Sequence, residues 1–85
     1  MNKVMNFMEY TDRILMAVKN CDDVSTIFTI HSAYSCSFKD CYNEIHEEED
    51  DIDHLYNVID IFIDATEQIE ERLFDLYVEE FKRLS

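Results

Sequence analysis

Apolar residues recur every three or four positions along most of the chain, which is the spacing of one face of an α-helix. In the first segment these positions are Val4, Phe7, Met8, Thr11, Ile14, Leu15 and Val18. The polar stretch 20–23 then interrupts the pattern, and Asp22 or Asp23 is a suitable N-cap for a helix that follows. The spacing therefore predicts a first helix over residues 3–19.

A similar period continues through the second segment. Its apolar positions are Val24, Ile27, Phe28, His31, Tyr34, Phe38, Cys41, Tyr42 and Ile45. The β-branched residues at its start would favour a strand when taken alone. The helical period extends much further than this local preference, so the pattern predicts a second helix over residues 23–47.

The third segment has the most regular pattern and predicts a helix over residues 51–84. Its apolar positions are Ile52, Leu55, Tyr56, Ile59, Phe62, Ile63, Thr66, Ile69, Leu73, Leu76, Tyr77, Phe81 and Leu84. At 1.5 Å per residue this helix is about 50 Å long, whereas a compact domain of this length has a radius of gyration of about 12 Å. We therefore expect an elongated molecule, or a partner that covers part of the helix.

Glycine and proline are both absent from the 85 residues. A β-protein needs glycine at turns with positive φ, so a chain without either helix breaker is expected to be mostly helical. The prediction is an all-α fold in which residues 1–85 form a single domain. Its three helices would make an antiparallel bundle with a long C-terminal helix.

The stretch from Leu55 to Ala65 is apolar on more than one face of the third helix. A helix that is apolar on most faces is buried on most faces. A second copy of the chain would provide the missing cover, which predicts a homodimer. The predicted oligomer interface is Leu55, Ile59, Phe62 and Ile63. The alternative is a monomer in which the first two helices flank the third.

The net charge is −13, from 20 acidic and 7 basic residues. The region from Asp40 to Phe81 contains 16 acids and a single base, Arg72, while residues 1–39 carry four of each. Such a chain repels nucleic acid and anionic membranes and attracts basic protein surfaces. Direct binding to nucleic acid or to a membrane is therefore not expected.

Six of the acids of the third helix fall on one face. They are Asp53, Asp60, Asp64, Glu67, Glu71 and Asp75, which we call the acidic stripe. A second group precedes it, the acidic run Glu44, Glu47, Glu48, Glu49, Asp50 and Asp51. Acids at the start of a helix favour its dipole, but that does not explain acids beyond the first turn. Like charges four residues apart destabilise a helix, so both groups are predicted to bind a partner.

No metal or cofactor is expected. His31, Cys36, Cys41 and His46 are spaced five residues apart, a step that turns a helix by about 500°, so neighbours point about 140° apart. Structural zinc needs ligand pairs that converge. A di-metal carboxylate site needs Glu-x-x-His motifs on two helices, and Asp51-x-x-His54 is the single near match. Glycine-containing elbows and phosphate-binding loops are absent, so no enzymatic activity is expected.

One motif resembles an enzyme family. Glu44-x-x-Glu47, a spacer of 19 residues and Glu67-x-x-Glu70 are similar to the magnesium-binding pattern of the all-helical MazG-like nucleotide pyrophosphohydrolases. In that family the last position is an aspartate and basic residues lie near the phosphates. This alternative implies a Mg²⁺-dependent nucleotide hydrolase.

In size, acidity and helical character the chain resembles the DNA-mimic inhibitors that phages make against restriction enzymes, CRISPR effectors or nucleoid proteins. The resemblance implies an anti-restriction or anti-CRISPR inhibitor that blocks a basic, nucleic-acid-binding surface of a partner protein. A helical assembly or regulatory subunit that binds through its apolar patch is the other alternative. Three cysteines, an odd number, in a helical chain without a signal-peptide pattern indicate reduced thiols in the cytoplasm, which would be the host cytoplasm for a phage protein.

Overall fold

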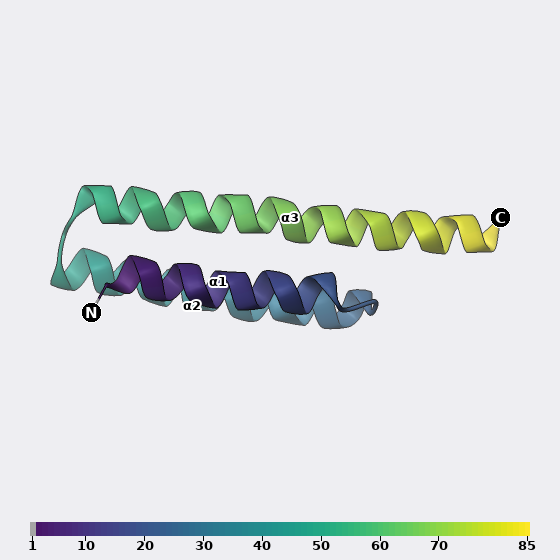
Figure 1. The fold of residues 1–85 in the computed structure, drawn as a ribbon, viewed down its shortest axis with the longest axis horizontal. Helices are drawn as coiled ribbons and strands as arrows, with labels where there is room; N and C mark the ends of the chain where they lie inside the picture. The colour runs from purple at the N-terminus through teal and green to yellow at the C-terminus, as the bar shows by residue number, and fades with distance from the viewer. Residues whose placement is uncertain (1) are drawn as a thin grey trace.

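The computed structural model describes residues 2–85 and consists of three helices (Figure 1). They are α1 (Lys3–Lys19), α2 (Val24–Glu48) and α3 (Ile52–Leu84). Along these residues there is no strand. The all-α fold and the long C-terminal helix are thus confirmed, and each helix begins and ends within one residue of its predicted bounds.

Side-chain caps begin all three helices. Asn2 accepts hydrogen bonds from the backbone amides of Val4 and Met5, and Asp23 accepts one from the amide of Ser25. Asp51 caps α3 in the same way. Caps of this kind bind backbone N–H groups that have no partner within the helix. These caps explain how short polar junctions can separate the helices in a chain without proline or glycine.

The α2–α3 junction contains the one positive-φ backbone conformation among the described residues, at Asp50 with φ 47°. Its amide donates to the carbonyl oxygen of Ile45 at 2.8 Å, across the end of α2. Glycine usually occupies this position, and aspartate is among the few other residues that tolerate it. Asp50 therefore helps to reverse the chain direction, which is a structural role for one member of the acidic run.

The helices run antiparallel in chain order, so α1 and α3 point the same way (Figure 1). The molecule is elongated, with dimensions of 53 × 16 × 16 Å. The C-terminal part of α3 extends past the α1–α2 loop (Figure 1), and every residue from Glu79 onward is exposed. None of the three helices is long and apolar enough to cross a membrane, as judged over residues 2–85.

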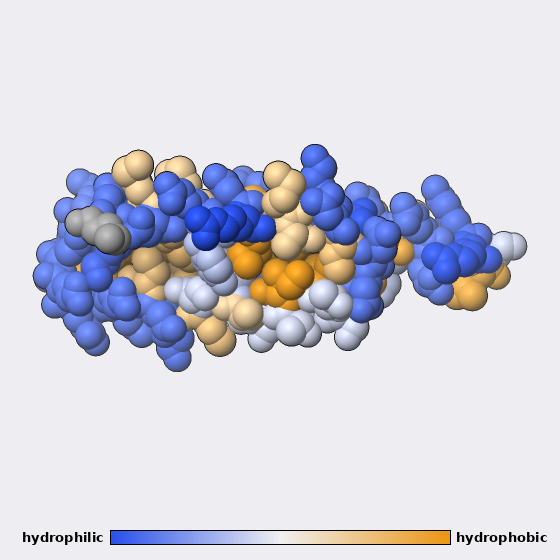
Figure 2. Space-filling view, turned by 60° about the horizontal axis from the view of Figure 1, so that its bottom comes forward, coloured by the Kyte–Doolittle hydropathy of each residue, from blue (hydrophilic) through white to orange (hydrophobic). Residues whose placement is uncertain are grey.

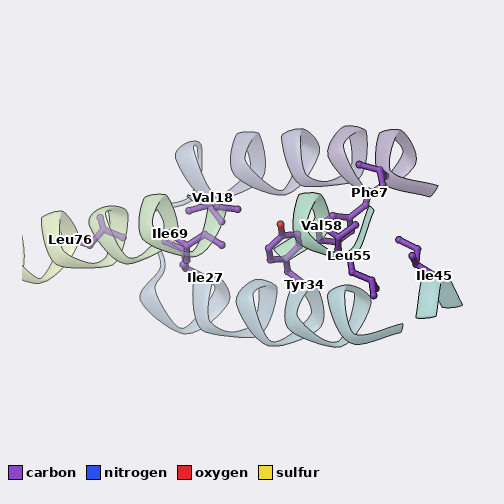
Figure 3. Packing of buried hydrophobic residues seen from close by; sticks show 11 residues of the cluster. Phe7, Val18, Ile27, Tyr34, Ile45, Leu55, Val58, Ile69 and Leu76 are labelled. Carbon is purple, nitrogen blue, oxygen red and sulfur yellow. The ribbon is translucent and has the colours of Figure 1, made fainter. Parts of the chain in front are cut away.

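An aromatic cluster from all three helices forms the middle of the core. Tyr34 of α2 is completely buried and stacks on Phe7 of α1 and Phe62 of α3, with ring centroids 5.5 Å away in each case. Phe38 stacks on Phe62 at 4.1 Å. Further along, Val18, Ile27, Ile69 and Leu76 continue the core towards the α1–α2 loop (Figure 3).

The Tyr34 hydroxyl shares a buried hydrogen bond of 2.8 Å with the hydroxyl of Thr11. Burial raises the pKa of Tyr34 to about 12, so the phenol is neutral at physiological pH. The bond satisfies the buried hydroxyl of Tyr34 and fixes the position of α1 against α2.

Candidate functional site

The acidic stripe lies on the surface of α3 directed away from its core residues. All six members, Asp53, Asp60, Asp64, Glu67, Glu71 and Asp75, are exposed. At 100° per residue they fall within an arc of about 80°, and that arc is roughly opposite the buried positions of the helix. The structure therefore places the six predicted carboxylates on one face.

No ion pair between residues 2 and 85 involves a member of the stripe. Among residues 2–85, the one side-chain hydrogen bond to a member of the stripe runs from the Gln68 amide to Asp64, at 2.9 Å. Neighbouring Cβ atoms along such a face are about 5–6 Å apart. The stripe is thus a row of hydrated negative charges that the protein itself does not neutralise.

Arg72, the single base between Asp40 and Phe81, has a structural role instead. Its guanidinium donates to the Asp22 carboxylate at 2.7 Å and to the carbonyl oxygen of Cys21 at 3.0 Å. These bonds attach the α1–α2 loop to α3, on the side of the helix away from the stripe's centre. Arg72 is therefore occupied, and the acidic stripe has no internal counterion near its middle.

A groove of about 590 Å³ separates α1 from the C-terminal half of the stripe. Leu15 and Met16 line it from α1, and Glu71 and Asp75 line it from α3. The aliphatic part of a lysine or arginine side chain could lie along the apolar wall while its charged end reaches the carboxylates. Lys19 and Arg72 also line the groove, so it combines carboxylates with two basic side chains beside the stripe.

The acidic run at the α2–α3 junction differs from the stripe because several of its members have partners in the chain. Lys3 of α1 pairs with Glu48 at 2.8 Å and with Glu44 at 3.3 Å. The hydrogen bond to Glu48, followed by that to Glu44, raises the pKa of the Lys3 amine above its usual value. These two carboxylates connect α1 to α2 and are less available to an outside partner than predicted.

The remaining members of the run surround two histidines. Glu49 lies 3.2 Å and Asp51 lies 3.8 Å from Nδ1 of His54, and Asp50 lies 3.4 Å from Nδ1 of His46. Glu47 is exposed and forms no ion pair within residues 2–85. Of the six predicted binding residues in the run, Glu47 is thus the one with the fewest internal contacts.

Replacing His54 with glutamine is expected to destabilise the protein in acid and to have little effect at mild alkaline pH. The hydrogen bond to Glu49, helped by Asp51 and Asp53, raises the pKa of His54. A raised folded-state pKa contributes stability below the unfolded value of about 6.5, and the contribution is lost as the pH rises through the folded value. Urea unfolding of both proteins at pH 5.5 and pH 8.5 measures this difference.

The matched variant is Glu49→Gln, which removes the carboxylate but keeps the histidine. Because the partner is gone, this variant should lose most of the pH dependence attributed to His54. A His54→Gln effect of equal size at both pH values would contradict the assignment of the shift to Glu49.

The four residues predicted for an oligomer interface do not lie on one accessible face. Leu55 is 9% exposed and belongs to the core of a single chain. Phe62 is half-buried and stacks on Phe38 and Tyr34. Ile59 is also half-buried, and Ile63 is half exposed. Leu55 and Phe62 thus pack within the single chain, because α1 and α2 together cover more of α3 than one stripe.

The residues considered as metal ligands are not gathered. No group of three or more His, Cys, Asp or Glu side chains within the described part of the chain is arranged to hold a metal ion. Stacking of Tyr34 on Phe62 places Glu44, at the other end of the antiparallel pair, about 20 Å along the bundle from Glu67. The motif similar to the nucleotide pyrophosphohydrolases therefore does not form a site within one chain.

The sequence matches no family model, and no curated protein sequence and no solved structure is detectably similar to the chain.

Proposed function

We propose that this protein binds a basic, nucleic-acid-binding surface of another protein and blocks it. The observation that carries the proposal is the acidic stripe, a row of six exposed carboxylates that form no ion pair with any residue from 2 to 85. A surface helix normally carries both signs of charge, because opposite charges three or four residues apart stabilise it and like charges destabilise it. The stripe lacks this compensation along its whole length, which fits a face that meets positive charge elsewhere.

The density of charge on α3 approaches that of one nucleic-acid strand. Between Asp53 and Glu80 the helix carries nine exposed carboxylates over about 40 Å, and the six on the face of the acidic stripe are spaced on average about 6–7 Å apart along the axis. A single strand of duplex DNA carries one phosphate per about 3.4 Å. Lysines and arginines spaced to contact phosphates would therefore find a carboxylate of the stripe at about every second phosphate interval.

The proposed biological role is that of an inhibitor of the DNA-mimic type. Such a protein would act in the cytoplasm, which is the host cytoplasm for a phage protein, on a restriction enzyme, a CRISPR effector or a nucleoid protein. Free cysteines at 21, 36 and 41 fit a reducing compartment. The residues proposed to contact the target are the acidic stripe together with Glu47, with the rest of the acidic run at its margin.

Affinity for the target is expected to fall steeply with salt. Attraction between exposed charges is screened over about 8 Å at physiological ionic strength, so binding should weaken at least about tenfold between 50 and 200 mM NaCl. The experiment captures binding proteins from bacterial lysate at low salt, elutes them with a salt gradient and measures each purified protein for nucleic-acid binding and for salt-dependent affinity. Partners that lack nucleic-acid affinity, or whose binding is unchanged by salt, would contradict the proposal.

A further inference from the structure

A second apolar stripe runs along α3, separate from the residues that pack in the core. Its members are Ile52, Tyr56, Ile59, Ile63, Phe74, Tyr77, Phe81 and Leu84, and all except the half-buried Ile59 are exposed. At 100° per residue the eight positions fall within an arc of about 80°, and this arc is about 100° away from the acidic stripe. Neither α1 nor α2 covers this face.

The most exposed members of the second apolar stripe lie where α3 has no neighbouring helix. Burial within a single chain does not explain apolar residues at these positions. Phe81 is 73% and Leu84 is 79% exposed, on the part of α3 that extends past the α1–α2 loop (Figure 1). Hydrophobic residues are also visible on this projecting end in Figure 2, next to hydrophilic ones. Exposed apolar residues with a polar rim are typical of a protein interface.

The spacing of the second apolar stripe is similar, to within one residue, when it is read from either end. Its first four members are separated by steps of 4, 3 and 4, and its last four by steps of 3, 4 and 3. The polar residues Thr66 and Glu70 interrupt it midway. If two α3 helices lie antiparallel with Gln68 of each at the same level, Ile52 lies opposite Leu84, and the other members are matched in the same way to within one residue.

We propose that a second copy of this chain covers the second apolar stripe, in a dimer whose two α3 helices are antiparallel about a two-fold axis near Gln68. A two-fold contact uses the same patch on both subunits, and the mirrored spacing provides this self-complementarity. The 3–4 steps are those of helices that pack side by side along a seam. The apolar half near the start of one α3 thereby covers the apolar half near the end of the other.

The exposed area is sufficient for such a dimer. The seven exposed members are each half to four-fifths accessible, which for side chains of this size amounts to on the order of 800 Å² together, the amount that each partner contributes to a standard interface. The predicted homodimer is thus retained with a different interface, in which Ile63 and the residues of the projecting end replace Leu55 and Phe62.

The symmetry has a consequence for the acidic stripe that rests on the proposed function. A two-fold axis perpendicular to the two α3 helices places both acidic stripes on the same side of the dimer, running in opposite directions. The dimer would then present two antiparallel rows of carboxylates, as duplex DNA presents two antiparallel rows of phosphates. Mutual repulsion of the two rows should weaken the dimer at low salt.

Sedimentation of the full chain in 50 and 500 mM NaCl tests the interface. We expect a dimer that tightens as salt is raised, which is opposite to the expected salt dependence of target binding. Phe81→Glu should raise the dimer dissociation constant at least about 100-fold, because each dimer contains two copies of the change. Met16→Glu is the matched control on exposed α1, and it should leave the constant within about threefold of wild type.

A cross-linking measurement tests the orientation independently. In a background with Ser at positions 21, 36 and 41, checked for helicity, Ile52→Cys and Leu84→Cys proteins are oxidised separately and as a mixture. The antiparallel register predicts cross-linking in the mixture only, because equivalent positions 52 and 52 would be about 48 Å apart. Cross-linking of either variant alone, or a wild-type monomer at several hundred micromolar in 500 mM NaCl, would overturn the proposal.

The two proposals fail in different ways. Loss of the dimer without loss of target binding would remove the further inference and leave the proposed function intact. A dimer that forms as expected, without any basic target that binds in a salt-sensitive way, would remove the proposed function and leave the dimer intact.

Discussion

Replacing Tyr34 with alanine is expected to lower the free energy of unfolding by about 3–5 kcal/mol. Tyr34 is completely buried between Phe7 of α1 and Phe62 of α3, so its loss leaves a cavity where all three helices meet. A domain of this length has a total stability of roughly 4–13 kcal/mol. The variant should therefore be substantially unfolded at 37 °C, as thermal and urea denaturation followed by circular dichroism would show.

Tyr34→Phe is the matched control, because it keeps the ring and removes the hydroxyl that bonds to Thr11 at 2.8 Å. Leaving the buried Thr11 hydroxyl without its partner should cost about 1–2 kcal/mol. The alanine variant must then be clearly less stable than the phenylalanine variant. Equal losses would mean that packing of the ring contributes little and that the aromatic cluster is not the centre of the core.

Reversing Glu67 and Glu71 to lysine is expected to weaken target binding at least about 100-fold, since like charges brought together at an interface cost several kcal/mol. Both side chains are exposed and lie in the middle of the acidic stripe. The fold should be unaffected, because the new lysines would lie one turn from Asp64 and Asp75 and form helix-stabilising pairs. Titration calorimetry with the captured target, alongside thermal unfolding, measures both effects.

Glu9→Lys with Asp40→Lys makes the same change in net charge on exposed sites of α1 and α2. This control should weaken binding by no more than about tenfold, through the long-range field alone. If both double variants lose the same affinity, binding depends on net charge and not on the stripe. If neither loses affinity, the acidic stripe is not the interface.

The bounds of the helices could be predicted because three local signals agree. The apolar period, the aspartate caps and the absence of proline and glycine all locate the same junctions. Asp23 and Asp51 cap the helices that the pattern predicted. The β-branched start of α2 is also helical, because burial of Ile27 against the core outweighs a local strand preference.

The division of α3 into a core face and a second apolar stripe could not be predicted from the same pattern. A periodic sequence shows how wide the apolar surface is, but not which part of it each neighbouring helix covers. Leu76 and Phe81 belong to one continuous pattern, yet the first is buried and the second is 73% exposed. The two residues point about 140° apart around α3, and which of these sides α1 and α2 cover is a tertiary property.

Within the candidate site, the common face of the acidic stripe could be predicted from the sequence, but the ion pairs of the acidic run could not. The stripe depends on the rotation per residue of a single helix, which the sequence specifies. Pairing of Glu44 and Glu48 with Lys3 joins residues more than 40 positions apart, and no local signal indicates it. The role of Arg72 in attaching the α1–α2 loop depends in the same way on long-range packing.

Competition between this protein and nucleic acid for one captured target tests the central claim most directly. Fluorescence anisotropy of a labelled DNA or RNA bound to the target is measured while wild-type protein is added, with the Glu67→Lys/Glu71→Lys variant in a parallel titration. The proposed function predicts that wild-type protein releases the nucleic acid completely and that the variant releases it only at concentrations at least about 100-fold higher. A target that is saturated with wild-type protein and still binds nucleic acid with full affinity would contradict the claim.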